Sequence, residues 1–211
     1  MKAEPYWADN QTMLYLGDCR DVLRSLPAES VHCVVTSPPY WGLRDYGIEP
    51  SVWDGEDCEH EWHEERILRR GHPGEKTTLA GTQTAQLSKA AGAQGAFCCC
   101  CPAWRGTLGL EPTPELYVQH IVEVFREVKR VMRKDATLWL NLGDSYAAHR
   151  PRANAFHSQS AGYGDQSPAF TAAQQAVDLR GKHPVLKDKD LIGIPWRVAF
   201  ALQADGWWLR S

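Results

Sequence analysis

The sequence predicts an α/β protein built around a parallel sheet, because strand-like apolar runs alternate with segments of helical spacing. Strands are predicted over residues 13–16, 31–35 and 137–142, and helices over residues 21–26, 113–134 and 194–204. Two long polar stretches, residues 68–97 and 147–183, interrupt this alternation. Such stretches cannot bury much apolar surface, so we expect them to be loops that are functional or disordered rather than part of the scaffold.

The first strand–helix–strand unit is short. Residues 13–16 (MLYL) are apolar, and residues 21–26 (DVLRSL) place apolar side chains at helical spacing until Pro27 stops the helix. Residues 31–35 (VHCVV) are β-branched and nearly all apolar, as expected of a strand that is covered on both faces. This order favours two parallel strands joined by the helix.

The second regular block begins at Thr113, which is a suitable helix cap, with Pro114 at the favoured first position. Apolar side chains recur at three- and four-residue steps along the helix, so one face is expected to lie in the core. Basic residues crowd its last turns, where they suit the helix dipole. Residues 134–136 are then predicted to turn the chain into the buried strand 137–142 (TLWLNL).

The last predicted helix, residues 194–204 (IPWRVAFALQA), ends before Asp205 and Gly206. Residues 207–211 (WWLRS) are predicted to open a further strand, with both tryptophans packed in the core.

Length, charge and hydropathy exclude several classes of protein. The 211 residues suit one domain with an insertion. The 23 basic and 26 acidic residues give a net charge of −3, so a DNA-binding face has to be a local patch. The start of the chain has no apolar run typical of a signal peptide, and no run approaches the length of a membrane span. We therefore expect a cytoplasmic protein with no membrane partner.

One motif points to chemistry. The sequence Thr-Ser-Pro-Pro-Tyr-Trp, residues 36–41, follows the strand 31–35 directly, and ligands of open parallel sheets bind beyond the carboxyl ends of strands. The two prolines stiffen the loop and remove backbone donors, which leaves mainly acceptors. A flat ring that bears an amino group would donate to the Ser37 hydroxyl and the Pro38 carbonyl, while Tyr40 stacks on its face. The amine nitrogen would then attack an electrophilic methyl group directly.

Residues 16–41, containing this motif, resemble the amino-methylating DNA methyltransferases of the permuted type, in which the catalytic motif precedes the cofactor motif. Residues 137–146 and 189–210 are similar to later segments of that family. The resemblance implies the Rossmann-like parallel sheet of a class I S-adenosylmethionine-dependent methyltransferase. In this family the Ser/Asp-Pro-Pro-Tyr loop holds the target amine, which maps onto catalytic residues Ser37, Pro38, Pro39 and Tyr40.

The resemblance also implies a cofactor and a partner. An acidic residue near the adenosyl part of S-adenosylmethionine maps onto Asp18. The partner is double-stranded DNA with the target base flipped out, in a bacterial or phage restriction–modification setting. The methylated atom is cytosine N4 or adenine N6, and Ser37 at the first motif position favours cytosine. Alternatives are methylation of RNA or of a protein glutamine.

The sequence departs from the family pattern in one respect. The family's glycine-rich cofactor loop, of Phe-x-Gly-x-Gly type, follows the region where this chain ends, and neither residues 106–110 (GTLGL) nor residues 142–144 (LGD) have that pattern. We therefore expect an incomplete methyltransferase whose cofactor site is supplied by a second chain or by a missing C-terminal segment. A different reading is a non-catalytic, zinc-bearing DNA-recognition or partner subunit, or an inactive fragment.

The cysteines predict a metal site. Cys58-x-His60 and Cys98-x-x-Cys101 supply four ligands of the kind that hold structural zinc. Cys99 and Cys100 leave the register open, and His63 is an alternative to His60. Residues 101–104 (CPAW) resemble the Cys-Gly-Ala-Trp ending of zinc-ribbon insertions, which favours Cys98 and Cys101. We expect a zinc-ribbon-like insertion that forms a small DNA-facing knob; the alternative is a set of reduced free thiols.

The two remaining cysteines, Cys19 and Cys33, lie in or beside predicted core elements and are expected to pack as small apolar side chains. Together these observations predict five segments along the chain: the catalytic-motif part of a methyltransferase core over residues 1–48, a zinc-binding insertion with a flexible loop over 49–110, further core over 111–146, a polar, DNA-facing loop over 147–184, and a last piece of core over 185–211.

Overall fold

The computed structural model describes residues 4–55, 58–62, 95–147, 186–187 and 189–210. The chain forms two compact units. The first comprises residues 1–38, 118–142 and 195–211, and the second residues 39–117 and 143–194, so the division falls inside the Ser-Pro-Pro-Tyr motif. The domain boundaries predicted from the sequence stay predictions. Of the two polar stretches predicted to be loops, residues 68–94 and 148–183 lie outside the described residues.

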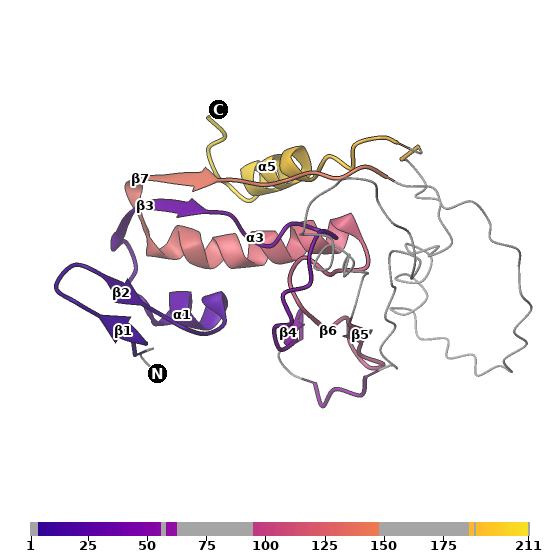
Figure 1. Ribbon diagram of the computed structural model, residues 1–211, viewed down its shortest axis with the longest axis horizontal. Coiled ribbons are helices and arrows are strands. Elements are labelled where there is room, and N and C mark those ends of the chain that lie inside the picture. Colours follow the sequence, from indigo (N-terminus) through magenta and orange to yellow (C-terminus); the bar gives the residue numbers. More distant parts are fainter. Residues whose placement is uncertain (1–3, 56–57, 63–94, 148–185, 188, 211) are drawn as a thin grey trace, which may run out of the picture. The chain divides into compact units, whose positions relative to one another are not determined.

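The first unit contains a small parallel sheet, as the sequence predicts. Strand β3 (Val31–Thr36) pairs in parallel with β7 (Met132–Leu140), and Figure 1 shows them side by side. The register shifts between the pairs Val31–Met132 and Cys33–Thr137, which places extra residues in β7. The turn predicted over residues 134–136 falls in this bulged part of the strand.

Three helices accompany this sheet. Helix α1 (Cys19–Ser25) precedes β3, and α3 (Pro114–Val131) leads into β7. Helix α5 (Ile194–Ala204) has the bounds that the sequence predicts. The predicted cap of α3 is confirmed, because Thr113 Oγ1 accepts the Leu116 N–H at 3.1 Å.

Within the first unit, polar contacts join α3 to its neighbours. Arg130 donates to the carbonyls of Leu23 and Leu26, which ties the end of α1 to α3. Arg126 pairs with Asp205, just beyond α5, with 2.8 Å between Nη2 and Oδ1. These contacts anchor both neighbours along the basic C-terminal half of α3.

The prediction that residues 13–16 form a strand of the parallel sheet is wrong. Strand β2 (Met13–Leu14) instead pairs antiparallel with β1 (Trp7–Ala8). The carboxylate of Asp9 accepts the N–H groups of Gln11 and Thr12, and this tight turn folds the chain back on itself. Local turn chemistry therefore decides the partner of this apolar run.

The burial predicted for the parallel strands is also wrong. Val35 is 79% exposed and Trp139 62% exposed, because β3 and β7 are the only strands of this sheet among the described residues and its faces are only partly covered. Cys33, in β3, is exposed for the same reason, and Cys19, the first residue of α1, is exposed as well, so neither is packed as predicted. 

The C-terminal residues give a mixed result. Trp207 makes an edge-on contact with Phe125, with ring centroids 6.3 Å apart, but Trp208 is 90% exposed and not in the core. Residues 207–210 form no strand with any described residue.

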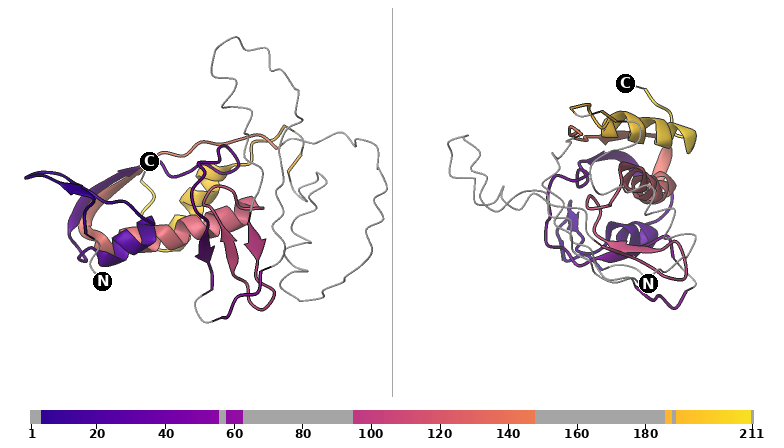
Figure 2. Two further views of the ribbon diagram at one scale, coloured as in Figure 1. Left: turned by 60° about the horizontal axis from the view of Figure 1, so that its bottom comes forward. Right: turned by 90° about the vertical axis from the view of Figure 1, so that its right-hand side faces the viewer.

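The second unit contains an antiparallel sheet in the order β4 (Ser51–Trp53), β6 (Trp104–Gly106), β5 (Ala96–Phe97), visible side by side in Figure 2. Its interior is aromatic: Trp53 and Trp104 are buried, and the Trp53 indole N–H donates to the Gly106 carbonyl at 3.2 Å. No helix among the described residues is long and apolar enough to cross a membrane.

Candidate functional site

The Ser-Pro-Pro-Tyr motif begins where β3 ends. Thr36 is the last residue of β3, and its carbonyl accepts the Asn141 N–H at 2.9 Å, so the paired strands end together at this point. Ser37 follows immediately and is exposed. The motif therefore starts at the carboxyl end of a parallel strand, where the chemistry of such sheets is expected.

Hydrogen bonds from residues 109–117 hold the second half of the motif and Gly42, the residue after it. We call residues 109–117 the brace. The Tyr117 hydroxyl donates to the Pro39 carbonyl at 2.9 Å. The indole N–H of buried Trp41 donates to the Glu111 carbonyl at 3.0 Å, and the Gly42 N–H donates to the Gly109 carbonyl at 2.7 Å. Three hydrogen bonds thus fix the backbone on both sides of Tyr40.

Tyr117 remains a hydrogen-bond donor because its environment disfavours the ionised phenol. Burial raises the pKa of Tyr117 well above its usual value, and the nearby Glu111 and Tyr40 raise it further. The hydroxyl consequently keeps its proton over the ordinary range of pH and continues to donate to Pro39.

Two glycines lie directly against the motif. Gly109 has a φ of +93°, and a Cβ there would come within 3.1 Å of both the Pro39 Cβ and the Tyr40 carbonyl oxygen. A Cβ on Gly143 would lie 2.6 Å from Cδ2 of the Tyr40 ring. The sequence pattern of the two glycine segments, residues 106–110 and 142–144, does not by itself predict this role. Their position just before a helix cap and just after a strand is the signal that could have shown it.

Asp144 fixes the backbone next to Gly143. Its carboxylate accepts the N–H groups of Gly193, at 3.0 Å from Oδ2, and of Ile194, at 3.2 Å from Oδ1. It also accepts the N–H of Ser145, whose carbonyl in turn accepts the Ile192 N–H. The carboxylate therefore joins the segment after β7 to the first residue of α5.

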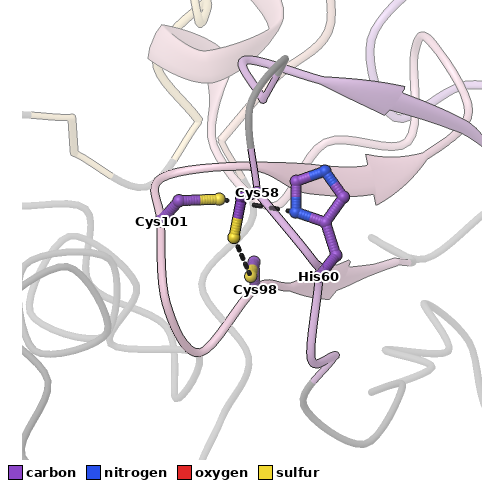
Figure 3. Close-up of side chains that lie close together, drawn as sticks. All are labelled: Cys58, His60, Cys98 and Cys101. Carbon is purple, nitrogen blue, oxygen red and sulfur yellow. Dashed lines mark hydrogen bonds between the residues drawn. The ribbon is translucent and has the colours of Figure 1, made fainter.

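The four residues predicted to bind a metal come together in the second unit (Figure 3). One ligand atom from each of Cys58, His60, Cys98 and Cys101 lies within 4.8 Å of the other three. The sulfur atoms of Cys58 and Cys98 are 4.0 Å apart, and Cys101 Sγ lies 3.5 Å from His60 Nδ1. Sulfur ligands of tetrahedral zinc, with bonds of about 2.3 Å, lie about 3.8 Å apart. The alternative ligand His63 lies outside the described residues.

Backbone hydrogen bonds help to place these side chains. The Cys100 N–H donates to the Cys98 sulfur at 3.3 Å, and the Cys99 N–H donates to the Glu61 carbonyl at 2.7 Å. Burial raises the pKa of the Cys98 thiol, but hydrogen bonds from the Cys100 N–H and His60 outweigh it and lower the pKa to about 6. Burial, with Cys101 and Cys98 nearby, raises the pKa of Cys58 to about 12. A divalent cation would displace the remaining protons.

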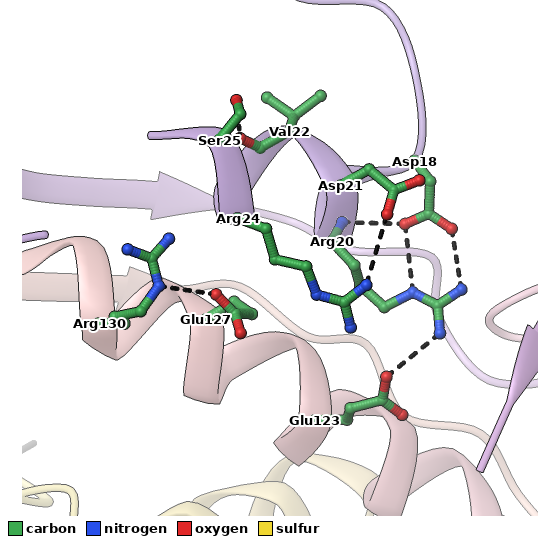
Figure 4. A network of polar contacts seen from close by, with 9 residues as sticks. All are labelled: Asp18, Arg20, Asp21, Val22, Arg24, Ser25, Glu123, Glu127 and Arg130. Atoms are coloured by element: carbon green, nitrogen blue, oxygen red, sulfur yellow. Dashed lines mark hydrogen bonds and ion pairs between the residues drawn. The ribbon is translucent and has the colours of Figure 1, made fainter. Parts of the chain in front are cut away.

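Asp18, the residue predicted to contact the cofactor, takes part in a network of charges in the first unit (Figure 4). It is the N-cap of α1, and its carboxylate accepts the Arg20 N–H at 2.9 Å and pairs with the Arg20 guanidinium at 2.9 Å. Arg20 is only 8% exposed and also pairs with Glu123 at 3.2 Å. The cofactor role of Asp18 stays a prediction.

Fold and motif together define a class: an α/β protein with a parallel pair of strands and a Ser-Pro-Pro-Tyr loop at a strand end. Residues 31–211 match the family model described as DNA methylase, and the chain belongs to this N6/N4 DNA methylase family of amino-methyltransferases. The match begins at the first residue of β3 and therefore includes the whole motif.

Three curated relatives are similar over nearly the whole chain. They are the Type II methyltransferases M.XycI of Xanthomonas campestris pv. cyanopsidis, 38% identical over 100% of the chain, M.Cfr9I of Citrobacter freundii, 35% identical over 100%, and M.SmaI of Serratia marcescens, 33% identical over 94%. The matched parts are 48%, 47% and 45% of those proteins, so the chain spans about half their length. No solved structure matches the chain.

Proposed function

We propose that the protein methylates the exocyclic amine of a flipped-out base in double-stranded DNA, with S-adenosylmethionine as methyl donor. The observation that carries this proposal is the Ser-Pro-Pro-Tyr loop at the carboxyl end of β3, in a chain of the DNA methylase family. The relatives are named Type II methyltransferases, which supports DNA as the substrate.

The Ser-Pro-Pro-Tyr motif of this chain contributes the groups that would hold the target amine. The Ser37 hydroxyl and the Pro38 carbonyl accept hydrogen bonds from the amine, which draws electron density toward its nitrogen, and Tyr40 stacks on the base. The Pro39 carbonyl already accepts the Tyr117 hydroxyl, so its part is to hold the loop. S-adenosylmethionine, when bound, supplies an electrophilic methyl group to that nitrogen.

The cofactor side of the site is incomplete in the described residues. Asp18 is the single residue predicted to contact the cofactor, and its carboxylate already accepts hydrogen bonds from Arg20. We propose that a second chain or a further segment of the protein supplies the greater part of the cofactor site, because the chain spans about half the length of its relatives. Asp18 would add at most one contact to the cofactor and has no part in the methyl transfer itself.

Cytosine N4 is the first choice of target atom and adenine N6 the second, because the motif begins with Ser37 rather than an acidic residue or its amide. Both amines present the same pair of donors, so the pocket chemistry is common to both. Methylation of RNA or of a protein glutamine, and a non-catalytic DNA-recognition or partner subunit, are the other readings that an activity assay has to separate.

We further propose that Cys58, His60, Cys98 and Cys101 hold one structural zinc ion in a zinc-ribbon-like insertion. The ligand set is that of closed tetrahedral zinc sites, which stabilise small folds and take no part in catalysis. The ion would link residues 58–60 to the loop between β5 and β6 and so stabilise the antiparallel sheet. A small, rigid module of this kind suits contact with DNA.

A comparison of DNA binding with turnover tests the methyltransferase proposal. The protein, expressed from its complete reading frame, is assayed for transfer of labelled methyl groups to unmodified DNA, beside Ser37→Ala. Because Ser37 is proposed to polarise the amine, we expect Ser37→Ala to lower kcat about 100-fold or more, with DNA affinity changed less than about threefold. Equal turnover by the variant and the wild type would contradict the proposed role of the motif.

A further inference from the structure

Glu111 carries a carboxylate in an unusual position. It is 1% exposed, in the connection between β6 and α3, and its Oε2 accepts the Gly109 N–H at 2.8 Å. At the start of helix α3, the Leu116 N–H donates to the Thr113 hydroxyl and not to this carboxylate. A buried charge is costly unless it makes strong hydrogen bonds, so its presence here calls for a specific role.

The hydrogen bond from Gly109 to Glu111 supports a tight turn at the start of the brace, which the Leu110 N–H closes by donating to the Thr107 carbonyl at 3.0 Å. The turn holds Gly109 at its positive φ, with its carbonyl directed at the Gly42 N–H, 2.7 Å away. The same glycine lies against Pro39 and the backbone of Tyr40. The Glu111 carboxylate thus helps to hold Gly109, which contacts the chain on both sides of Tyr40, at Pro39 and at Gly42.

The backbone of Glu111 adds a second contact with the motif. Its carbonyl accepts the indole N–H of Trp41, the residue after Tyr40. Glu111 also lies close enough to Tyr117 to contribute to the raised pKa of that hydroxyl, which donates to the Pro39 carbonyl. The contacts from the brace to the motif therefore centre on Glu111.

We propose that Glu111 is a positioning residue for methyl transfer: through Gly109 and Trp41 it holds residues 39–42 in the conformation that receives the target base. This inference rests on the proposed function of the motif. A loop fixed in advance does not have to be ordered when the base enters, and a shift of about 1 Å at a reacting group can lower the rate about 100-fold. Glu111 itself touches neither the base nor the cofactor in this account.

Glu111→Ala and Glu111→Gln distinguish this role from general support of the fold. The glutamine side chain keeps an oxygen that accepts the Gly109 N–H, whereas alanine removes it. In the protein expressed from its complete reading frame, we expect Glu111→Ala to lower kcat about 10- to 100-fold, with the KM for DNA changed less than about threefold. Glu111→Gln should restore kcat to within about fivefold of the wild type. Glu49→Ala, at an exposed acidic residue outside the brace, is the matched control and should leave both constants unchanged.

Gly109→Ala keeps the test decisive if Glu111→Ala does not fold. Its Cβ would press on Pro39 and Tyr40, and we expect the same selective loss of kcat. If Glu111→Ala folds, a wild-type kcat in this variant would overturn the inference. If Glu111→Ala does not fold, a wild-type kcat in Gly109→Ala would overturn it. So would equal kcat values for Glu111→Ala and Glu111→Gln. If the wild-type protein itself transfers no methyl group to DNA, the proposed function fails instead, and the two failures are thereby distinguished.

Discussion

Gly143 lies against the ring of Tyr40 so closely that a Cβ at position 143 would be 2.6 Å from Cδ2 and 2.8 Å from Cε2. The segment after β7 therefore forms one wall for the aromatic residue of the motif. Asp144, anchored to the N–H groups of Gly193 and Ile194, keeps that wall in place. The orientation of Tyr40 follows from backbone packing as well as from its two prolines.

Gly143→Ala should displace the Tyr40 ring and impair stacking of the base. We expect kcat/KM for methyl transfer to fall about tenfold or more, with a stability cost of about 1–3 kcal/mol from overpacking. A double-mutant cycle with Tyr40→Ala checks the mechanism, because the glycine substitution should have little further effect once the ring is absent. Full additivity of the two effects would show that Gly143 acts elsewhere.

Tyr117→Phe should destabilise the second unit by about 1–2 kcal/mol, since the Pro39 carbonyl loses its donor. Urea unfolding followed by tryptophan fluorescence measures this change. An unchanged unfolding midpoint would mean that solvent replaces the hydroxyl at no cost.

The pH dependence of stability provides a separate test of Tyr117. Its pKa is raised in the folded protein, by burial first and by Glu111 second, whereas an unfolded tyrosine ionises near pH 10. The contribution of this group to stability is therefore fully present below about pH 10 and is lost as the pH rises through the folded value. Between about pH 8 and about pH 10.5, the wild type should lose more stability than Tyr117→Phe. Parallel losses in both proteins would contradict this assignment.

Asp18→Asn separates a structural from a cofactor role, because asparagine also caps helices but carries no charge. Glu123→Gln is the matched control, since it removes the other carboxylate partner of Arg20. Each substitution should cost about 1–3 kcal/mol of stability. If Asp18 contacts the cofactor, titration calorimetry should show weaker binding of S-adenosylmethionine in Asp18→Asn alone. Equal weakening in both variants would leave Asp18 as a purely structural residue.

The metal proposal predicts about one zinc ion per purified chain. Cys98→Ser should abolish zinc binding, while Cys99→Ser and Cys100→Ser, whose sulfurs are not among the four clustered ligand atoms, should retain it. Removing zinc with a chelator should also change the circular dichroism, because the ion is proposed to stabilise the antiparallel sheet. Zinc-free protein with an unchanged spectrum, or equal zinc content in Cys98→Ser, would contradict the proposal.

The sequence alone predicts the elements whose signals are local. Helix α5 has its predicted bounds, and Thr113 caps α3, because spacing and capping depend on a few neighbouring residues. The four clustered side chains are those chosen from the sequence, where spacing left the register open and the resemblance of residues 101–104 to a zinc-ribbon ending favoured Cys98 and Cys101. The exposure of Val35 could not be predicted, since burial depends on which elements cover the sheet.

The supporting contacts of the motif were not predictable for a related reason. Gly109 and Gly143 are far from Tyr40 in the sequence, and glycine carries no side-chain signal that indicates a partner. The buried position of Glu111 even contradicts the usual preference of a carboxylate for the surface. The role of such residues can be recognised only from the folded structure. They hold the motif in place and so support the proposed chemistry.

Identification of the methylated product tests most directly whether the protein methylates an exocyclic amine in DNA. The protein from its complete reading frame is incubated with S-adenosylmethionine labelled in the methyl group and with unmodified DNA, RNA or protein, and the products are digested and separated. We expect label in the nucleosides of DNA, as N4-methylcytosine first and N6-methyladenine second, with an initial rate of labelling that is lower by about 100-fold or more for Ser37→Ala. Label confined to RNA or to a protein glutamine, or no transfer to DNA by the wild type, would contradict this expectation.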